Sequence, residues 1–319
     1  MSEIKETYTN LIKEISRFVV GREKEIKYLV ISLLSEGHVL IEGVPGIAKT
    51  LLAKIFAQIL DLKFKRIQFT PDLLPSDIIG SYVFDIKTQD FIFFQGPIFT
   101  NVLLADEINR SPPKTQSALL EAMQERQVTV GGITKILERP FLVIATQNPL
   151  ELEGTYPVPE AQLDRFMFRI LLTYPKPEEE MEVIRKYGKN LELDIDPIIS
   201  KDDILKFMNK VNEIHVSNDV EKYVVELINN TRNDKRLALG ASTRSAVFMI
   251  RASKALAAIS GRDYVIPDDI KELAFPILNH RLIFSLEYRK FSGEQHFLNV
   301  YKDTSDLIEG YIKALKPPR

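Results

Sequence analysis

The chain has 319 residues, of which 45% are hydrophobic and 27% are charged, and this composition predicts a globular protein with one large domain or two. Its formal charge of −2 gives no electrostatic reason to expect a dedicated nucleic-acid-binding protein, and the lack of cysteine excludes disulfides, thiol catalysis and cysteine zinc sites. The polar N-terminus and the lack of any apolar run of ~18 residues predict a cytoplasmic protein without membrane insertion.

Hydrophobic periodicity predicts that strands and helices alternate through the first half of the chain. Helices are expected over 23–35 and 49–60, and short apolar runs predict strands at 39–42, 65–69, 101–105, 141–145 and 169–172. This alternation implies an α/β core, in which helices cover a parallel sheet and ligands bind at the carboxyl ends of the strands.

The first predicted strand leads into the loop GVPGIAKT, residues 43–50. Loops of the form GxxxxGK(S/T) bind nucleotide phosphates through backbone N–H groups and a lysine, and their Ser/Thr hydroxyl holds Mg²⁺. Gly43, Lys49 and Thr50 match this pattern, whereas Ala48 occupies the position of the second glycine. The loop therefore predicts a nucleotide site with one residue off pattern. The alternative is an ordinary turn with a surface lysine.

Two further segments are predicted to form hairpins. Residues 82–94 carry strand-like apolar and aromatic side chains, and residues 127–136 contain two strand-like runs around a Gly131-Gly132 turn. From the pattern alone, either segment could equally be an edge hairpin that completes a larger sheet.

The segment TYPKP, residues 173–177, marks the best domain boundary, and the three glutamates after it favour a helix start. The chain beyond it is predicted to be nearly all helical. One helix is expected to have an apolar stripe of Val220, Tyr223, Val224, Leu227 and Ile228. Helix starts are predicted at Asp219, at Ser242 or Thr243, and at Pro267. Residues from about 288 onward are only weakly periodic and carry no predicted element.

An acidic pair, Asp106 and Glu107, follows the predicted strand at 101–105. In a phosphate-loop ATPase a carboxylate must stand at such a strand end to organise Mg²⁺. Asp106 would orient the water shell of the metal, and Glu107 would act as general base for the attacking water. An acidic pair after a strand is also a common start of a helix, but its place downstream of a phosphate loop favours the catalytic interpretation.

Three stretches closely resemble the MoxR family of AAA+ ATPases: LLADEINRSPPKTQ at 103–116, LLEAMQE at 119–125, and GVPGIAKT at 43–50 with its alanine. The resemblance covers about residues 19–280. It implies an AAA+ α/β core over 1–175, with inserts at about 81–95 and 127–136. A smaller all-α lid domain over 176–319 would follow.

The resemblance also implies roles for individual residues. Asn148 in ATQNP matches the sensor-1 residue beside the γ-phosphate, Arg165 in EAQLDRF matches the arginine finger presented to a neighbouring subunit, and Arg244 in GASTR matches sensor 2 on the lid. Taken singly, Asn148 could be a turn residue and the two arginines could be solvated or paired at the surface. Arg169 competes with Arg165 for the finger role.

The resemblance further implies ATP and Mg²⁺ as cofactors. Thr50 and Asp106 would serve the metal. The expected nucleotide-contacting residues are Val20, Gly21, Gly43, Val44, Pro45, Gly46, Ile47, Ala48, Lys49, Thr50 and Leu51.

Such an enzyme is expected to be a homo-oligomeric ring, usually hexameric, that uses ATP to remodel, mature or load metal into partner protein complexes. The implied partners are proteins with von Willebrand factor A domains and a protein client. Alternatives are the ATPase subunit of a magnesium-chelatase-like complex and a nucleotide-gated binding module without turnover. A DNA motor is disfavoured by the mild acidity of the chain.

Overall fold

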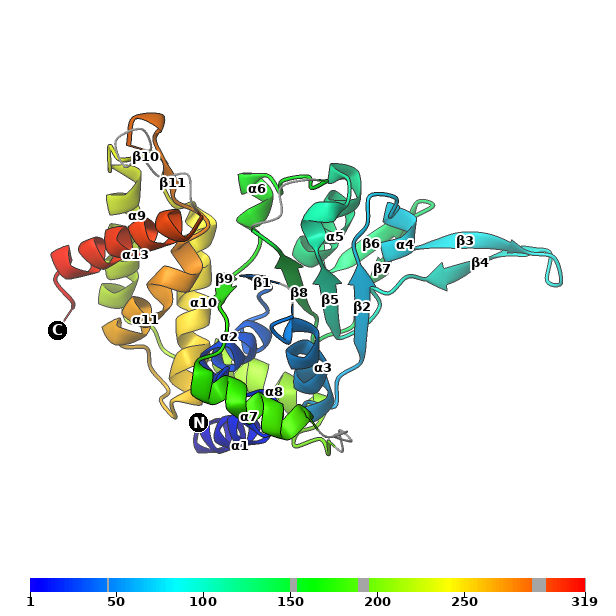
Figure 1. Ribbon diagram of the computed structural model, residues 1–319, viewed down its shortest axis with the longest axis horizontal. Coiled ribbons are helices and arrows are strands. Elements are labelled where there is room, and N and C mark those ends of the chain that lie inside the picture. The colour runs from blue at the N-terminus through cyan, green and yellow to red at the C-terminus, as the bar shows by residue number, and fades with distance from the viewer. Residues whose placement is uncertain (45, 150–153, 189–194, 289–296, 319) are drawn as a thin grey trace.

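A five-stranded parallel sheet forms the centre of the computed structural model, which describes residues 1–44, 46–149, 154–188, 195–288 and 297–318 (Figure 1). Its strand order is β2-β5-β8-β1-β9, and every neighbouring pair is parallel. The bounds are Val39–Gly43 for β1, Phe64–Gln68 for β2, Val102–Asp106 for β5, Leu142–Gln147 for β8 and Phe168–Leu172 for β9. All five predicted strands and the α/β fold class are therefore confirmed.

Both faces of the sheet are buried, because alternate side chains of its strands join two different hydrophobic clusters. On β5, for example, Leu104 packs into one cluster and Leu103 into the other. The first cluster contains α1 (Ser2–Ser16), α2 (Glu23–Leu34) and α3 (Lys49–Ile59), and the second contains α5 (Pro113–Glu125). The near-continuous apolar strands follow from this double burial.

Short elements link the strands on the side of the second cluster. They are α4 (Pro75–Ile79), the 3-10 helix η1 (Ile108–Arg110) and α6 (Glu160–Leu163). The two insert segments form antiparallel hairpins, β3 (Gly80–Asp85) with β4 (Asp90–Gln95) and β6 (Gln127–Val130) with β7 (Ile133–Ile136). Among the described residues, each hairpin is its own two-stranded sheet, so the alternative of an edge hairpin is wrong. The β3–β4 hairpin projects from the body (Figure 1).

The C-terminal part is helical, with one short two-stranded sheet. Its elements are α7 (Pro177–Tyr187), α8 (Lys201–Asn212), α9 (Asn218–Arg232), β10 (Leu237–Leu239), α10 (Thr243–Ile259), α11 (Pro267–Leu278), β11 (Ile283–Phe284) and α13 (Phe297–Ala314). The helices α1 and α13 carry no sequence prediction, whereas α8 lies in the stretch predicted to be nearly all helical without bounds of its own. The first hydrophobic cluster continues from α1–α3 into these helices, so the boundary proposed after residue 175 stays a prediction.

Serine hydroxyls cap two of the predicted helices. Ser217 begins α9 by accepting from the Val220 N–H, so the cap predicted at Asp219 is wrong by two residues. Ser242 begins α10 by accepting from the Ser245 N–H, which decides between Ser242 and Thr243. The predicted apolar stripe of α9 is buried in full. Within the described part of the chain, the search for a helix long and apolar enough to span a bilayer finds none.

His38, directly before β1, fastens the sheet to α5. Its Nδ1 accepts from the Val143 N–H and its Nε2 donates to the Met123 carbonyl, both at 3.0 Å. An imidazole that accepts at one nitrogen must be neutral. Burial lowers the pKa of His38 to about 4, and the nearby Arg126 and Arg251 act in the same direction.

The folded protein should therefore lose stability in acid. Between pH 6.5 and 4 the unfolded chain protonates His38 and the folded chain does not, so the free energy of unfolding falls as pH falls. Between pH 7 and 5, the His38→Gln variant should lose about 2 kcal/mol less than wild type in urea unfolding. His215→Gln, at an exposed histidine, should keep the wild-type loss. An unchanged loss in His38→Gln would contradict the assignment.

Candidate active site

The phosphate loop joins β1 to α3 at the carboxyl edge of the sheet. A side chain at Gly43 would place its Cβ 2.8 Å from the carbonyl oxygen of Leu172, so only glycine fits there. Ala48 has φ 62° and ψ 25°, a left-handed conformation that favours glycine. The residue that departs from the motif thus keeps the backbone shape of the motif. Pro45 lies outside the described residues.

Lys49 begins α3 and reaches back across the loop. Its Nζ donates to the Gly43 carbonyl oxygen at 2.9 Å. Burial lowers the pKa of Lys49, while the carboxylates of Asp106 and Glu107 act in the opposite direction. The ammonium is therefore held between the loop and the acidic pair.

A cleft of about 510 Å³ opens beside the loop. It is lined by Gly46, Ile47, Ala48, Lys49, Thr50, Leu51, Arg66, Gln68, Asp106, Glu107 and Asn148. On the other side of the loop lies an apolar hollow of about 230 Å³ that shares Gly46, Ile47, Ala48 and Leu51 with the cleft. Val19, Val20, Pro175, Val183 and Tyr187 also line this hollow. A polar cleft and an apolar hollow on one loop suit a polyphosphate and a base, respectively.

Several predicted residues lie at this place. Lys49, Thr50, Asp106, Glu107 and Asn148 line the cleft, and Val20 lines the hollow. Gly21, next to Val20, has φ 67°, and a Cβ there would lie 2.5 Å from the Glu179 side chain. Thr50 and Asp106 present oxygen atoms, the donors that Mg²⁺ prefers, and Mg²⁺ needs only one or two protein ligands when phosphates and water complete its shell.

Three donors hold the carboxylate of Asp106, which ends β5. Thr146 Oγ1 donates to Oδ1 at 2.5 Å, and Arg66 donates to Oδ2 through Nε at 3.1 Å and Nη2 at 2.7 Å. The same Thr146 oxygen accepts from the Glu107 N–H at 2.9 Å. Thr146 therefore sets the position of both acidic residues from the neighbouring strand β8.

Glu107 follows with a left-handed backbone, at φ 56° and ψ 51°. Its Oε2 accepts from Gln68 Nε2 at 2.6 Å and lies 3.0 Å from Arg110 Nε. The strained turn lifts the carboxylate from the strand end toward the cleft, where β2 and η1 hold it.

Arg66, Gln68 and Thr146 carry no signal of a site in the sequence. Arg66 and Gln68 alternate with apolar residues on the edge strand β2, which is ordinary for a half-exposed strand. Thr146 is fully buried in β8, whose residues before it are all apolar, and a buried hydroxyl must find a partner.

None of the three predicted arginines is among the described residues that line the cleft. Arg165 Nη1 donates to the Leu120 carbonyl oxygen of α5 at 2.8 Å, and Arg244 Nη1 donates to Asp164 at 3.0 Å. Arg169 lies 3.1 Å from Glu42, and only 14% of its side chain is exposed. Arg165 and Arg169 are thus both bound inside their own chain, and the choice between them as the finger stays a prediction.

Comparison with known proteins agrees with this geometry. Residues 38–168 match the model of the ATPase family associated with various cellular activities (AAA), and residues 229–297 match the AAA lid domain. A crystal structure of a Cytophaga hutchinsonii protein assigned as an ATPase superposes with a TM-score of 0.90 at 45% identity. It covers 99% of this chain and 96% of that one. Fold and site thus define an AAA+ ATPase.

Sequence relatives narrow the class. The uncharacterized protein YeaC of Bacillus subtilis is 45% identical over 96% of this chain and 93% of its own. The chaperone MoxR1 of Mycobacterium tuberculosis is 45% identical over 88% of this chain and 77% of its own. The protein MoxR of Methylorubrum extorquens is 28% identical over 86% and 87%. The chain belongs to the MoxR family of AAA+ ATPases.

The Thr146 hydroxyl should be worth measurable stability. Thr146→Val keeps the shape of the side chain but leaves the buried Asp106 oxygen and the Glu107 N–H without their partner, at a cost of about 1–3 kcal/mol in urea unfolding. Thr9→Val is a matched control on the exposed face of α1 and should change stability by less than about 0.5 kcal/mol. A Thr146→Val protein as stable as wild type would refute the assignment.

Proposed function

We propose that this ATPase hydrolyses ATP with Mg²⁺ at the cleft beside the phosphate loop, as a cytoplasmic ring oligomer that remodels, matures or loads metal into partner protein complexes. The observation that carries the proposal is the convergence of Lys49, Thr50, Asp106, Glu107 and Asn148 on one cleft at one edge of the sheet. A nucleotide-gated module without turnover would not need the two carboxylates at the strand end.

Each side chain then has one task. The loop amides and Lys49 would bind the phosphates, and Thr50 and Asp106 would hold Mg²⁺, whose charge would offset that of the transferred phosphoryl group. Arg66 binds the Asp106 oxygen Oδ2, so an ion held by this carboxylate would share it with the arginine. Glu107, held through Oε2, takes the proton from the attacking water, and Asn148 orients that water.

An arginine from a second subunit completes the site in this proposal. Arg66 is the arginine that lines the described part of the cleft, and its Nε and Nη2 are both bound to Asp106. Charge stabilisation at the γ-phosphate then falls to Arg165 of a neighbouring copy, with Arg244 as the sensor on the lid. Such a trans site requires a neighbouring subunit, and the family resemblance suggests a ring of six.

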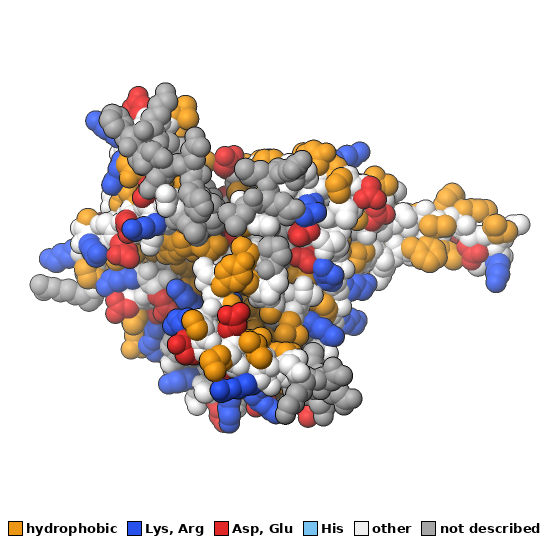
Figure 2. Space-filling view, viewed as in Figure 1, with side chains coloured by type: hydrophobic (Ala, Val, Ile, Leu, Met, Phe, Trp, Pro, Cys, Tyr) orange, Lys and Arg blue, Asp and Glu red, His pale blue; other side chains and the backbone are white. Residues whose placement is uncertain are grey.

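The β3–β4 hairpin supports a protein as the client. Its exposed apolar side chains gather on the arm that Figure 2 shows beyond the body of the molecule. They are Val83, Phe84, Ile86, Phe91, Ile92 and Phe94, each at least 40% exposed. A patch of this kind marks a contact with another protein. The relative MoxR1 is named a chaperone, which agrees with a protein client. As partners we propose proteins with von Willebrand factor A domains, which the family resemblance implies.

Binding and chemistry should separate in two variants. Glu107→Gln should bind ATP with the wild-type Kd while kcat falls by roughly 10²–10⁴, because only the general base is lost. Lys49→Ala should raise the Kd for ATP by at least about tenfold, because a charged hydrogen bond to phosphate is lost. Calorimetric binding and phosphate release measure the two effects. Equal ATP affinity in both variants and wild type would contradict this division.

Assembly should control turnover. Wild-type kcat per subunit should rise with protein concentration, and Arg165→Ala should abolish the rise, lowering kcat of the assembled protein by roughly 10³ or more, with ATP binding intact. Arg185→Ala, at an exposed arginine of α7, is the control and should keep the rise. A wild-type turnover that is independent of protein concentration would contradict a site completed by a neighbouring subunit.

A further inference from the structure

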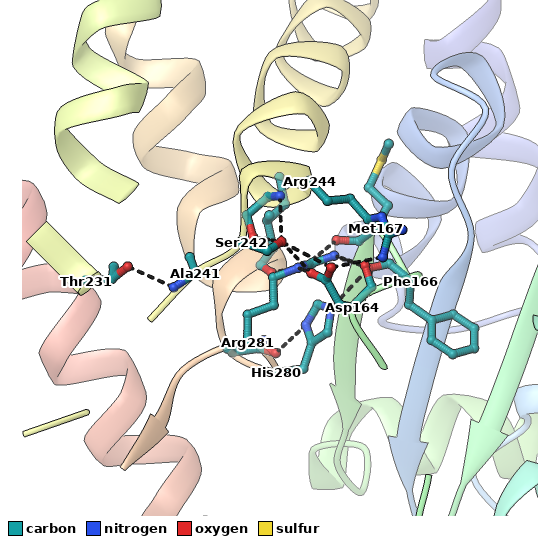
Figure 3. A network of polar contacts seen from close by, with 12 residues as sticks. Asp164, Phe166, Met167, Thr231, Ala241, Ser242, Arg244, His280 and Arg281 are labelled. Carbon is teal, nitrogen blue, oxygen red and sulfur yellow. Dashed lines mark hydrogen bonds and ion pairs between the residues drawn. The ribbon is translucent and has the colours of Figure 1, made fainter. Parts of the chain in front are cut away.

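The residue before Arg165 is held by the lid. Asp164 lies in the turn of residues 164–167 between α6 and β9, here called the finger turn. Its carboxylate accepts from Arg281 Nε at 2.7 Å, from Arg244 Nη1 at 3.0 Å, and from Ser242 Oγ at 2.9 and 3.1 Å (Figure 3). All three donors belong to the segment 229–297 that matches the AAA lid domain.

Arg281 also binds the main chain on both sides of Arg165. Its Nη2 donates to the carbonyl oxygens of Asp164 at 2.9 Å and Phe166 at 2.5 Å. His280 Nε2 donates to the same Phe166 oxygen at 3.0 Å, and Asn279 Nδ2 donates to the Arg169 carbonyl at 3.0 Å. Three consecutive lid residues thus donate hydrogen bonds to the backbone of the finger turn and of β9, the strand after it.

This contact cannot loosen gradually. The Arg281 side chain is 1% exposed, and the Asp164 side chain is 18% exposed. Separating a buried guanidinium from its carboxylate leaves an uncompensated charge, which is far costlier than losing a surface pair. Any displacement of the lid must therefore carry the finger turn with it or break the whole cluster at once.

Arg165 itself also contacts the core. Its Nη1 donates to the Leu120 carbonyl of α5, and its backbone N–H donates to the Gln162 carbonyl of α6 at 3.2 Å. Arg244 also reaches α5, with Nη2 3.3 Å from Gln124 Oε1. The finger turn is thus bound on one side to the core and on the other, through Asp164 and Phe166, to the lid.

We propose that Asp164 is a positioning residue that makes the placement of Arg165 depend on the position of the lid. The inference rests on the proposed function, in which Arg165 acts on the nucleotide of a neighbouring subunit. Asp164 does not touch the nucleotide in this scheme. Its task is to transmit lid movement in one subunit to the site of the next.

Mixed rings test this proposal. Glu107→Gln subunits keep the finger but cannot hydrolyse, and Arg165→Ala subunits keep the cleft but lack the finger. A mixture should regain turnover, because the intact cleft receives its finger from the Glu107→Gln subunit. Asp164→Asn placed in the finger-donating subunit should cut this recovery at least tenfold. The same change in the Arg165→Ala subunit should leave it within twofold.

Controls separate positioning from folding. Asp234→Asn removes another lid carboxylate, bound to Arg236 Nη2 and the Tyr311 hydroxyl, each at 2.6 Å, and should leave recovery unchanged in either subunit. Asp164→Glu keeps the charge but displaces the carboxylate, and should show the same asymmetry as Asp164→Asn. ATP binding and urea midpoints of every variant confirm that the subunits are folded.

The outcomes are distinct. Equal loss from Asp164→Asn in either subunit would show that Asp164 only fastens the lid, and recovery insensitive to the change in both would likewise overturn the inference. Both results leave the proposed function standing. No recovery from the parent mixture would overturn the trans finger itself, and this inference with it.

Discussion

The parallel alignment of β1, β5 and β8 is the constraint on which the rest of this structure depends. Parallel strands end at the same edge of a sheet, so the loops that follow them must open side by side. The register pairs Glu42 of β1 with Gln147 of β8, and Ala105 of β5 with Ala145 of β8. The phosphate loop, the acidic pair and Asn148 meet for this reason, although about a hundred residues separate the first from the last.

Burial then decides the chemistry at that edge. Asp106 is only 8% exposed, and a carboxylate so placed must find donors, which Thr146 and Arg66 supply from the strands on either side. The same threonine hydroxyl serves Glu107. Two acidic neighbours thus obtain different surroundings: one lies bound within the sheet, and the other is turned out by a left-handed backbone to face the cleft.

The arginines show how tertiary structure places similar residues in different surroundings. Arg165 and Arg169 lie four positions apart, and the sequence pattern allows either as a finger. The structure pairs Arg169 with Glu42 inside the sheet and leaves Arg165 in a turn between α6 and β9. The lid is tied to that turn through Arg281, whose buried charge is compensated by Asp164 from 117 residues away. Asp164 therefore joins, through Arg281 and Arg244, two parts of the chain that match separate family models.

The sequence by itself determined the phosphate loop, the acidic pair, the five core strands and several helices, because each depends on spacing within a few residues. It placed the cap of α9 at Asp219 rather than Ser217, since both residues suit a cap and only backbone geometry chooses. The tertiary structure alone decided that Arg66, Gln68 and Thr146 hold the acidic pair. It also decided that the two hairpins are separate sheets and that the lid binds the finger turn. Those contacts join residues distant in the chain, and local periodicity carries no information about which distant groups will share a buried charge.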